Sequence, residues 1–130
     1  MASSFFFVEK KETIEKRPCQ DYQKLNKGTI KDAYPLPRIS SLIDKLRKKM
    51  HFTKMDVRKG YNNILIEKDD QWKAAFITKY GLFQPTVMFF GLTNSLATFQ
   101  RMMDTIFVKQ LSKGWLIIYM DDMVVATGPD

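Results

Sequence analysis

The sequence predicts an α+β fold in which helices back an antiparallel sheet. Short apolar runs rich in β-branched and aromatic residues, such as residues 52–57 and 115–126, have the composition of strands. In two other segments, about 39–49 and about 95–111, apolar residues recur at helical spacing. A chain of 130 residues with 45% apolar content is large enough for one domain with a single core.

The first third of the chain is predicted to hold a basic hairpin and an extended linker. Residues 5–8 and 17–22 form the two strands, on either side of a charged spacer. A turn follows at residues 26–28, where Asn, Lys and Gly succeed one another. Pro35 and Pro37 fix their own φ angles and exclude the preceding residues from the helical region. The chain therefore runs extended into the first helix.

The middle of the chain is predicted as strands and turns that form a small antiparallel meander. The strand at residues 52–57 ends in a turn at residues 58–60. Residues 72–78 and 82–90 are two further extended segments. Pro85 has no N–H to donate to a neighbouring strand, so the second of these segments is expected at a sheet edge.

A helix and a hairpin complete the predicted fold. Ser95 and the polar residues before it are good N-caps for the helix at residues 95–111. Lys113 and Gly114 end this helix, and the chain continues into a hairpin at residues 115–126.

The composition excludes several classes of protein. No apolar run approaches the ~20 residues that a membrane-spanning helix needs, and residues 5–8 are too short for the core of a signal peptide. The single cysteine, Cys19, excludes an internal disulfide. These features predict an intracellular protein, in the cytoplasm or the nucleus, that is neither secreted nor inserted in a membrane.

The positive charge lies in the first half of the sequence. Residues 1–60 contain fifteen Lys and Arg against seven Asp and Glu, whereas residues 61–130 contain six against seven. The resulting net charge of +7 is typical of a protein with a polyanionic partner, and nucleic acid is the first candidate. A solvated basic surface without such a partner is the alternative.

Three aspartates are the candidate catalytic residues. Asp121 and Asp122 stand side by side between two apolar runs, where repulsion and lost hydration favour a bound cation such as Mg²⁺. Asp56 ends another predicted strand. If that strand lies beside the hairpin, the three carboxylates converge and can hold two divalent ions about 3.5–4 Å apart for phosphoryl or nucleotidyl transfer. The alternatives are a surface turn for the pair and a capping or ion-paired role for Asp56.

Five motifs occur in order along the chain. They are RPCQDY at residues 17–22, TIKDAYPLPR at 29–38, FTKMDVRKGYNNI at 52–64, VMFFGLTNSLATFQ at 87–100 and YMDD at 119–122. Together they resemble the reverse transcriptase of gypsy-class long-terminal-repeat retrotransposons. The resemblance implies an enzyme, a nucleotidyltransferase that acts as an RNA-directed DNA polymerase. It would add deoxynucleotides to a primer 3′-hydroxyl with two Mg²⁺ ions, or with Mn²⁺ in their place.

The resemblance also implies roles for individual residues. The catalytic residues and metal ligands would be Asp56, Asp121 and Asp122. The nucleotide-binding residues would be Lys10, Arg17, Tyr61, Phe90, Gly91 and Met120. The template or primer contacts would be Gln23, Ser95, Leu96 and Tyr119. Tyr61 would lie beneath the incoming sugar and exclude a 2′-hydroxyl, while Arg17 and Lys10 would supply positive charge to the triphosphate. For Tyr61 the alternative is ordinary core packing, and for Lys10 it is a solvated position.

The resemblance further implies the fingers and part of the palm of a polymerase. The fingers are expected at about residues 1–50 and 62–92, and the palm at about 51–61 and 93–130. Because the sequence ends a few residues after Asp122, the chain is expected to be truncated after the Tyr-Met-Asp-Asp hairpin, without thumb or ribonuclease H domain.

The expected partners are an RNA or DNA template with its primer, deoxynucleoside triphosphates, and the remaining polymerase, ribonuclease H and integrase segments of a polyprotein. The chain departs from the family at Gln23, where Arg is usual, and at Phe89 and Leu96, where proline is usual. Two other functions therefore stay open. One is a non-catalytic nucleic-acid-binding remnant, and the other is a protein-interaction fragment of a polyprotein.

Overall fold

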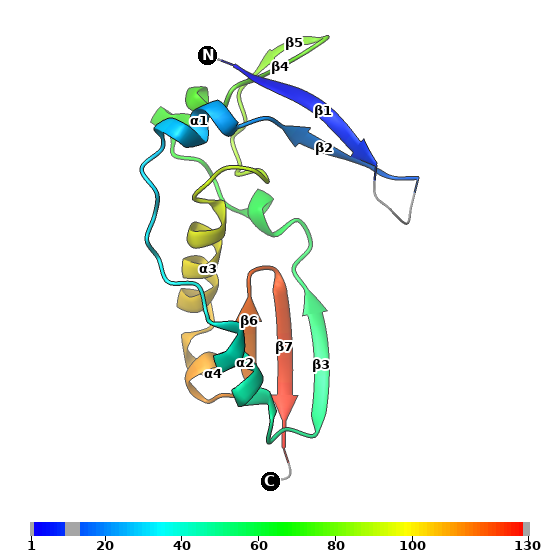
Figure 1. Ribbon diagram of the computed structural model, residues 1–130, viewed down its shortest axis with the longest axis vertical. Helices are drawn as coiled ribbons and strands as arrows, with labels where there is room; N and C mark the ends of the chain where they lie inside the picture. The colour runs from blue at the N-terminus through cyan, green and yellow to red at the C-terminus, as the bar shows by residue number, and fades with distance from the viewer. Residues whose placement is uncertain (1, 10–13, 129–130) are drawn as a thin grey trace. The chain divides into compact units, whose positions relative to one another are not determined.

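The computed structural model describes residues 2–9 and 14–128, and the chain forms two compact units (Figure 1). The first unit comprises residues 1–31 and 61–95, and the second comprises residues 32–60 and 96–130. Residues 32–50, which the sequence places with the fingers, are thus grouped with the second unit. Both units combine helices with sheets, so the predicted α+β class is confirmed.

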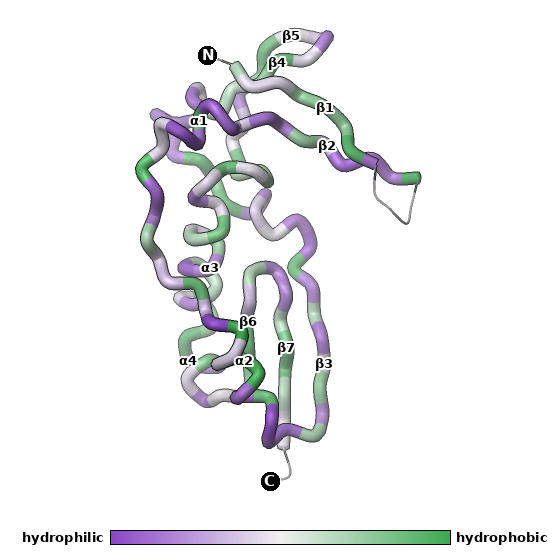
Figure 2. The backbone as a smooth tube through the Cα atoms, viewed as in Figure 1, coloured by the Kyte–Doolittle hydropathy of each residue, from purple (hydrophilic) through white to green (hydrophobic). Residues whose placement is uncertain are grey.

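The first unit is built on a four-stranded sheet in the order β2-β1-β4-β5. Its strands are β1 (Ser3–Glu9), β2 (Lys16–Gln20), β4 (Phe76–Thr78) and β5 (Gly81–Phe83). The pairing of β1 with β2 confirms the N-terminal hairpin. Hydrophobic residues occur along β1 and also on β4 and β5, while β2 is more hydrophilic (Figure 2).

The antiparallel pairing of β4 with β5 agrees with the predicted meander, and β4 also pairs with β1 in parallel, a contact that the sequence did not predict. The strands β4 and β5 have three residues each, too few to form an independent sheet. The Phe76 ring stacks between Phe5 and Phe83, with centroid distances of 5.5 and 5.9 Å, and this packing joins the short hairpin to β1.

Two segments of the first unit are helical where the sequence predicts turns or extended chain. The helix α1 (Gln23–Gly28) includes the predicted turn at residues 26–28. The Asn26 side chain donates to the Gly91 carbonyl at 2.6 Å and accepts from the Thr93 N–H at 2.8 Å, so distant residues hold the helical form. The 3₁₀ helix η2 (Lys68–Ala74) includes residues 72–74, which the sequence predicts as the start of the strand at 72–78.

A short 3₁₀ helix, η1 (Gly60–Asn63), begins the segment after the 58–60 turn. The predicted extended segment at 82–90 keeps strand pairing only in β5 and in one isolated bridge, between Leu65 and Val87. Pro85 lies between these two pairings and lacks the N–H that would continue the strand.

The second unit is built on a three-stranded antiparallel sheet in the order β3-β7-β6. Its strands are β3 (His51–Asp56), β6 (Leu116–Tyr119) and β7 (Asp122–Thr127). The first three residues of β6 are buried, as are Phe99 and Gln100 of the helix α3 (Ser95–Ile106). The core of this unit therefore contains β6 and one face of α3.

Both predicted helices of this region are shorter than their apolar patterns suggest. The helix α2 (Ile39–Leu46) buries no residue, so no packing extends it to residue 49. The predicted helix at 95–111 is interrupted at Phe107, after which α4 (Val108–Ser112) begins. Three of the four residues around Phe107 are β-branched, which lowers helix propensity there. Among the described residues, no helix is long and apolar enough to cross a membrane.

Candidate active site

The two adjacent aspartates lie at the tip of the β6-β7 hairpin. Tyr119 pairs with Asp122, so only Met120 and Asp121 form the loop between the strands. Met120 has a φ angle of +56°, in the left-handed region that residues with a side chain rarely adopt. Figure 2 shows a hydrophilic stretch where the tip of the hairpin leads into β7, next to two largely hydrophobic strands, as the sequence predicts for a hairpin that carries its acids at the tip.

The strand β3 brings Asp56 directly opposite Asp122. The Val57 N–H donates to the Asp121 carbonyl at 3.0 Å, which makes Asp56 and Asp122 a pair without hydrogen bonds between their own backbones. In such a pair the Cα atoms are about 4.5 Å apart and the two side chains share one face of the sheet. Asp56, Asp121 and Asp122 are thus neighbours at one end of one sheet.

Lys54 is a cation at this acidic site that the sequence reasoning missed. It lies two residues before Asp56 on the same face of β3, and its Nζ is 3.0 Å from Asp122 Oδ1. The hydrogen bond with Asp122 raises the pKa of Lys54, and the charges of Asp56 and Asp121 add to the effect. In the described part of the chain, no three Asp, Glu, His or Cys side chains are grouped as a ready metal site. Period-2 alternation along β3 was the signal that could have placed Lys54 beside the acids.

Gly60 fixes the approach of the chain to the acidic turn. A Cβ atom on Gly60 would lie 2.9 Å from Cζ of the buried Phe99 and 3.6 Å from the Asp121 Cβ. Real Cβ atoms do not come this close to a ring carbon, so only glycine fits between α3 and the turn. The sequence identified Gly60 only as a turn residue.

The predicted nucleotide-binding residues Tyr61, Phe90 and Gly91 gather in the first unit. Tyr61 is 5% exposed, and its ring packs edge to face against Phe90 with the centroids 4.8 Å apart. Gly91 has a φ angle of +95°, and a Cβ there would lie 3.6 Å from the Gln20 carbonyl oxygen. The backbone at Gly91 therefore favours glycine for its conformation, whereas a Cβ there would make only ordinary van der Waals contact with β2.

The other predicted contacts are distributed over several elements. Arg17 is exposed on β2, and Gln23 begins α1, where its N–H donates to Asp21 Oδ1 at 3.1 Å. The Ser95 hydroxyl donates to the Phe89 carbonyl at 3.1 Å, and Leu96 follows, half-buried, in α3. Tyr119 is the half-buried last residue of β6, and Lys10 lies outside the described residues.

Gln23 lines a pocket of about 550 Å³ in the first unit. Two of its other lining residues are Lys27 and Lys31, and the rest are the polar side chains of Asn26, Thr29 and Thr93. The Gln23 position thus belongs to a polar and basic hollow, which suits a negatively charged ligand.

Comparison with solved structures identifies the class of the fold. The foamy viral protease-reverse transcriptase, solved in complex with an RNA/DNA hybrid, matches 99% of this chain and 17% of its own chain. The TM-score is 0.84 and the sequence identity is 22%. The fold is therefore the polymerase-like α+β fold of reverse transcriptases.

The family follows from the sequence comparisons. A model described as reverse transcriptase (RNA-dependent DNA polymerase) matches residues 8–128, and the chain belongs to this family. An RNA-directed DNA polymerase homolog of Oenothera berteroana is 45% identical over 111 residues, which are 85% of this chain and 78% of that protein. The retrovirus-related Pol polyprotein from transposon gypsy of Drosophila melanogaster is 34% identical over 110 residues, 85% of this chain but 10% of the polyprotein. The resemblance to gypsy-class retrotransposons is thus confirmed, with the chain spanning a small part of those polyproteins.

Proposed function

We propose that this chain supplies the fingers and the catalytic part of the palm of a retroelement RNA-directed DNA polymerase. The first unit corresponds to the fingers and the second to the palm. The observation that carries the proposal is the register of β3 against β7, which sets Asp56 opposite Asp122 with Asp121 in the adjoining turn. Membership of the reverse transcriptase family supports a catalytic role for these three acids.

The three carboxylates fit a divalent cation by the nature of their oxygen atoms. The Lys54 ammonium group, 3.0 Å from Asp122, already stands at the position of a counter-ion to these acids. Asp56, Asp121 and Asp122 would hold two Mg²⁺ ions, or Mn²⁺, after Lys54 moves away. Bound there, such ions would favour ionisation of the primer 3′-hydroxyl and neutralise charge on the leaving pyrophosphate.

The remaining residues would bind and orient the substrates. Arg17, with Lys10, would pair with the triphosphate of the incoming deoxynucleotide. Tyr61 and Phe90 would face its sugar, while the backbone at Gly91 and at Met120 would approach the nascent base pair. The template or primer would contact Gln23, Ser95, Leu96 and Tyr119.

The proposed partners are an RNA or DNA template paired with a primer, and the other segments of a retroelement polyprotein. The foamy viral protein of the same fold was solved with an RNA/DNA hybrid, which supports a nucleic-acid duplex as the ligand. The positive net charge of the chain agrees with a polyanionic ligand.

Primer extension on an RNA template, with and without Mg²⁺, tests the proposal. Asp121→Asn keeps the size of the side chain and removes its charge, so we expect extension to fall by at least about 100-fold. Asp69→Asn makes the same change at an exposed position of η2 and should leave extension unchanged. Equal extension by the parent and Asp121→Asn would contradict the assignment of the catalytic site.

The Lys54 contact favours one second candidate, a non-catalytic nucleic-acid-binding remnant. A lysine paired with Asp122 at an exposed position offsets part of the repulsion among the three acids. This candidate predicts salt-sensitive binding to a primer-template but no metal-dependent extension by the parent chain. The same extension assay, combined with a binding measurement, therefore separates the two functions.

A further inference from the structure

A buried glutamine of α3 contacts the backbone of the acidic turn. Gln100 is fully buried, at 0% exposure, and a polar side chain in that position needs hydrogen-bond partners. Its Oε1 accepts from the Met120 N–H at 3.0 Å, and its Nε2 donates to Asp104 Oδ1 at 2.9 Å. The two partners fix the orientation of the amide, because an N–H requires an acceptor and a carboxylate requires a donor.

The bond to Met120 falls at the most constrained point of the hairpin. Met120 adopts its φ angle of +56° without being glycine, a conformation that persists only where the surroundings enforce it. The loop contains only Met120 and Asp121, and Asp122 begins β7 immediately after it. Holding the Met120 N–H therefore fixes the direction in which the chain enters Asp121 and Asp122.

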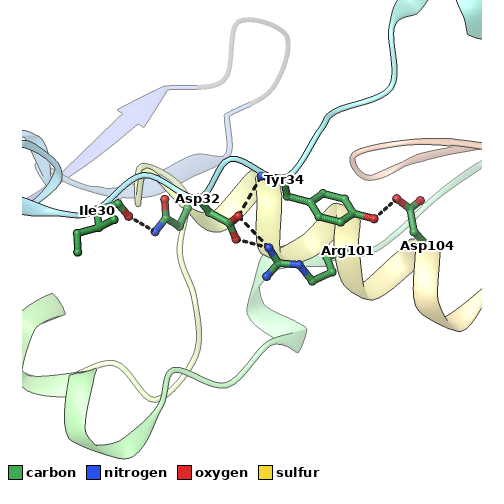
Figure 3. A network of polar contacts seen from close by, with 6 residues as sticks. Ile30, Asp32, Tyr34, Arg101 and Asp104 are labelled. Atoms are coloured by element: carbon green, nitrogen blue, oxygen red, sulfur yellow. Dashed lines mark hydrogen bonds and ion pairs between the residues drawn. The ribbon is translucent and has the colours of Figure 1, made fainter.

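Asp104, the second partner of Gln100, is itself held by the linker before α2. The Tyr34 hydroxyl donates to Asp104 Oδ2 at 2.7 Å, and this bond raises the pKa of Tyr34 (Figure 3). The Arg101 guanidinium carbon lies 4.9 Å from the centre of the Tyr34 ring. Arg101 Nη2 also binds both carboxylate oxygens of Asp32, at 2.8 and 2.6 Å.

We propose that Gln100 is a positioning residue for the polymerase reaction, with Asp104 and Tyr34 as its support. Gln100 touches neither substrate nor metal in this role; it acts through the Met120 N–H and thereby orients Asp121 and Asp122. The inference rests on the proposed polymerase function for its effect on rate. The hydrogen bond itself can be tested without any activity.

Gln100→Met removes both hydrogen bonds at similar side-chain volume, and Gln110→Met on α4 is the matched control. Hydrogen exchange of the Met120 amide, followed by NMR on the full chain, should be faster in Gln100→Met than in the parent and unchanged in Gln110→Met. In primer extension we expect the kcat of Gln100→Met to fall by about 10- to 100-fold, with a much smaller change in KM for the deoxynucleotide. Because partial unfolding also lowers the apparent kcat at unchanged KM, kcat is expressed per folded protein, with the folded fraction measured by circular dichroism.

Exchanging the charged and the neutral side chain between positions 100 and 104 provides a second test of the contact. Gln100→Glu places a second carboxylate next to that of Asp104, and the two negative charges repel each other. Protection of the Met120 amide from exchange should therefore fall, and so should kcat. Both should recover partly at lower pH, where the two carboxylates share a proton. Gln100→Glu combined with Asp104→Asn restores donor against acceptor and should recover most of the amide protection and kcat. Tyr34→Phe keeps the Gln100 bonds and should have a milder effect, which covers the case in which Gln100→Met does not fold.

Two results would overturn the inference. One is a Met120 amide that stays equally protected in Gln100→Met, and the other is a double variant no better than Gln100→Glu alone. If the parent itself extends no primer, the proposed function fails, while the exchange rates of the Met120 amide still decide whether Gln100 holds the turn.

Discussion

Tyr61 has to satisfy both the packing of the first unit and the proposed recognition of the sugar. Tyr61 is almost fully buried. Its ring packs edge to face against the ring of Phe90, a residue that is 59% exposed. A large ring held in this way cannot move aside for an additional hydroxyl group without loss of packing. The burial that makes Tyr61 a core residue is therefore also what would make it a rigid barrier to a ribonucleotide.

Replacing the ring tests that barrier. We expect Tyr61→Ala to admit ribonucleotides, which a primer-extension assay with each type of triphosphate would measure as a fall in discrimination of at least about tenfold. Tyr61→Phe keeps the ring and should discriminate as the parent does. Unchanged sugar selection in a folded Tyr61→Ala protein would reject the assignment.

Tyr22 shows how burial of one polar group links stability to pH. Its hydroxyl donates to the Ala74 carbonyl at 3.0 Å inside the first unit, and burial raises its pKa from 10.0 to about 12. A group whose pKa is raised by folding stabilises the fold below the unfolded pKa, and this contribution is lost as the pH rises towards the folded pKa.

Tyr22→Phe should therefore lower the free energy of unfolding by about 1 kcal/mol at pH 7, because the Ala74 carbonyl loses its partner. Between pH 10 and 12 the difference from the parent should shrink, since only the parent then loses the contribution of a neutral, buried tyrosine. Urea unfolding at several pH values measures both effects. Tyr80→Phe, at a side chain 79% exposed, should match the parent at pH 7.

At the scale of the elements, helix ends are decided by backbone conformation as much as by packing. Gly114 follows α4 with a φ angle of +75°, and no atom lies within 4 Å of where a Cβ would stand. Gly28 ends α1 in equally open space, without a positive φ angle. The two glycines therefore differ in conformation while both have room for a methyl group.

Alanine substitution separates these two effects. Gly114→Ala should lower the free energy of unfolding by about 1 kcal/mol, because alanine is strained in the left-handed region. Gly28→Ala should be neutral or raise it by about 0.4–1 kcal/mol, because alanine loses less conformational entropy on folding. Chemical denaturation measures both, and equal effects would show that the φ angle at Gly114 does not control this helix end.

At the scale of the whole molecule, the charge is shared more evenly than the sequence suggests. The first half of the sequence carries nearly all the excess of Lys and Arg. The structural units, however, draw on both halves: the first contains ten Lys and Arg against seven Asp and Glu, and the second contains eleven against seven. Each unit is thus positively charged and has the electrostatic means to bind a polyanion.

Binding to a primer-template should accordingly weaken with salt. If about three phosphates are neutralised, the association constant should fall by about 40-fold between 50 and 200 mM salt, since each contact releases counter-ions. Fluorescence anisotropy measures this dependence. A peptide nucleic acid duplex of the same sequence has no phosphates and should show little binding; salt-independent binding to the DNA or RNA duplex would contradict the prediction.

Local sequence patterns were sufficient for most elements but not for their limits. Short runs of β-branched and aromatic residues, together with turn residues, identified the N-terminal hairpin, β3 and the acidic hairpin, since strand propensity and turn chemistry act over a few residues. The parallel contact of β1 with β4, the helical form of α1 and the interruption at Phe107 depend on contacts or conformations that a short window does not contain. Tertiary packing overrides local preference at such places.

The sequence by itself determined the family, the α+β class and the three candidate acids, because the motifs and their order are properties of the chain alone. Only the tertiary structure decided that Asp56 faces Asp122, that Lys54 neutralises Asp122, and that Gln100 holds the turn between β6 and β7. Strand register depends on the packing of segments that are distant in the sequence. The same is true of the contact between Gln100 and Met120, which are twenty residues apart. Sequence spacing specifies neither of them.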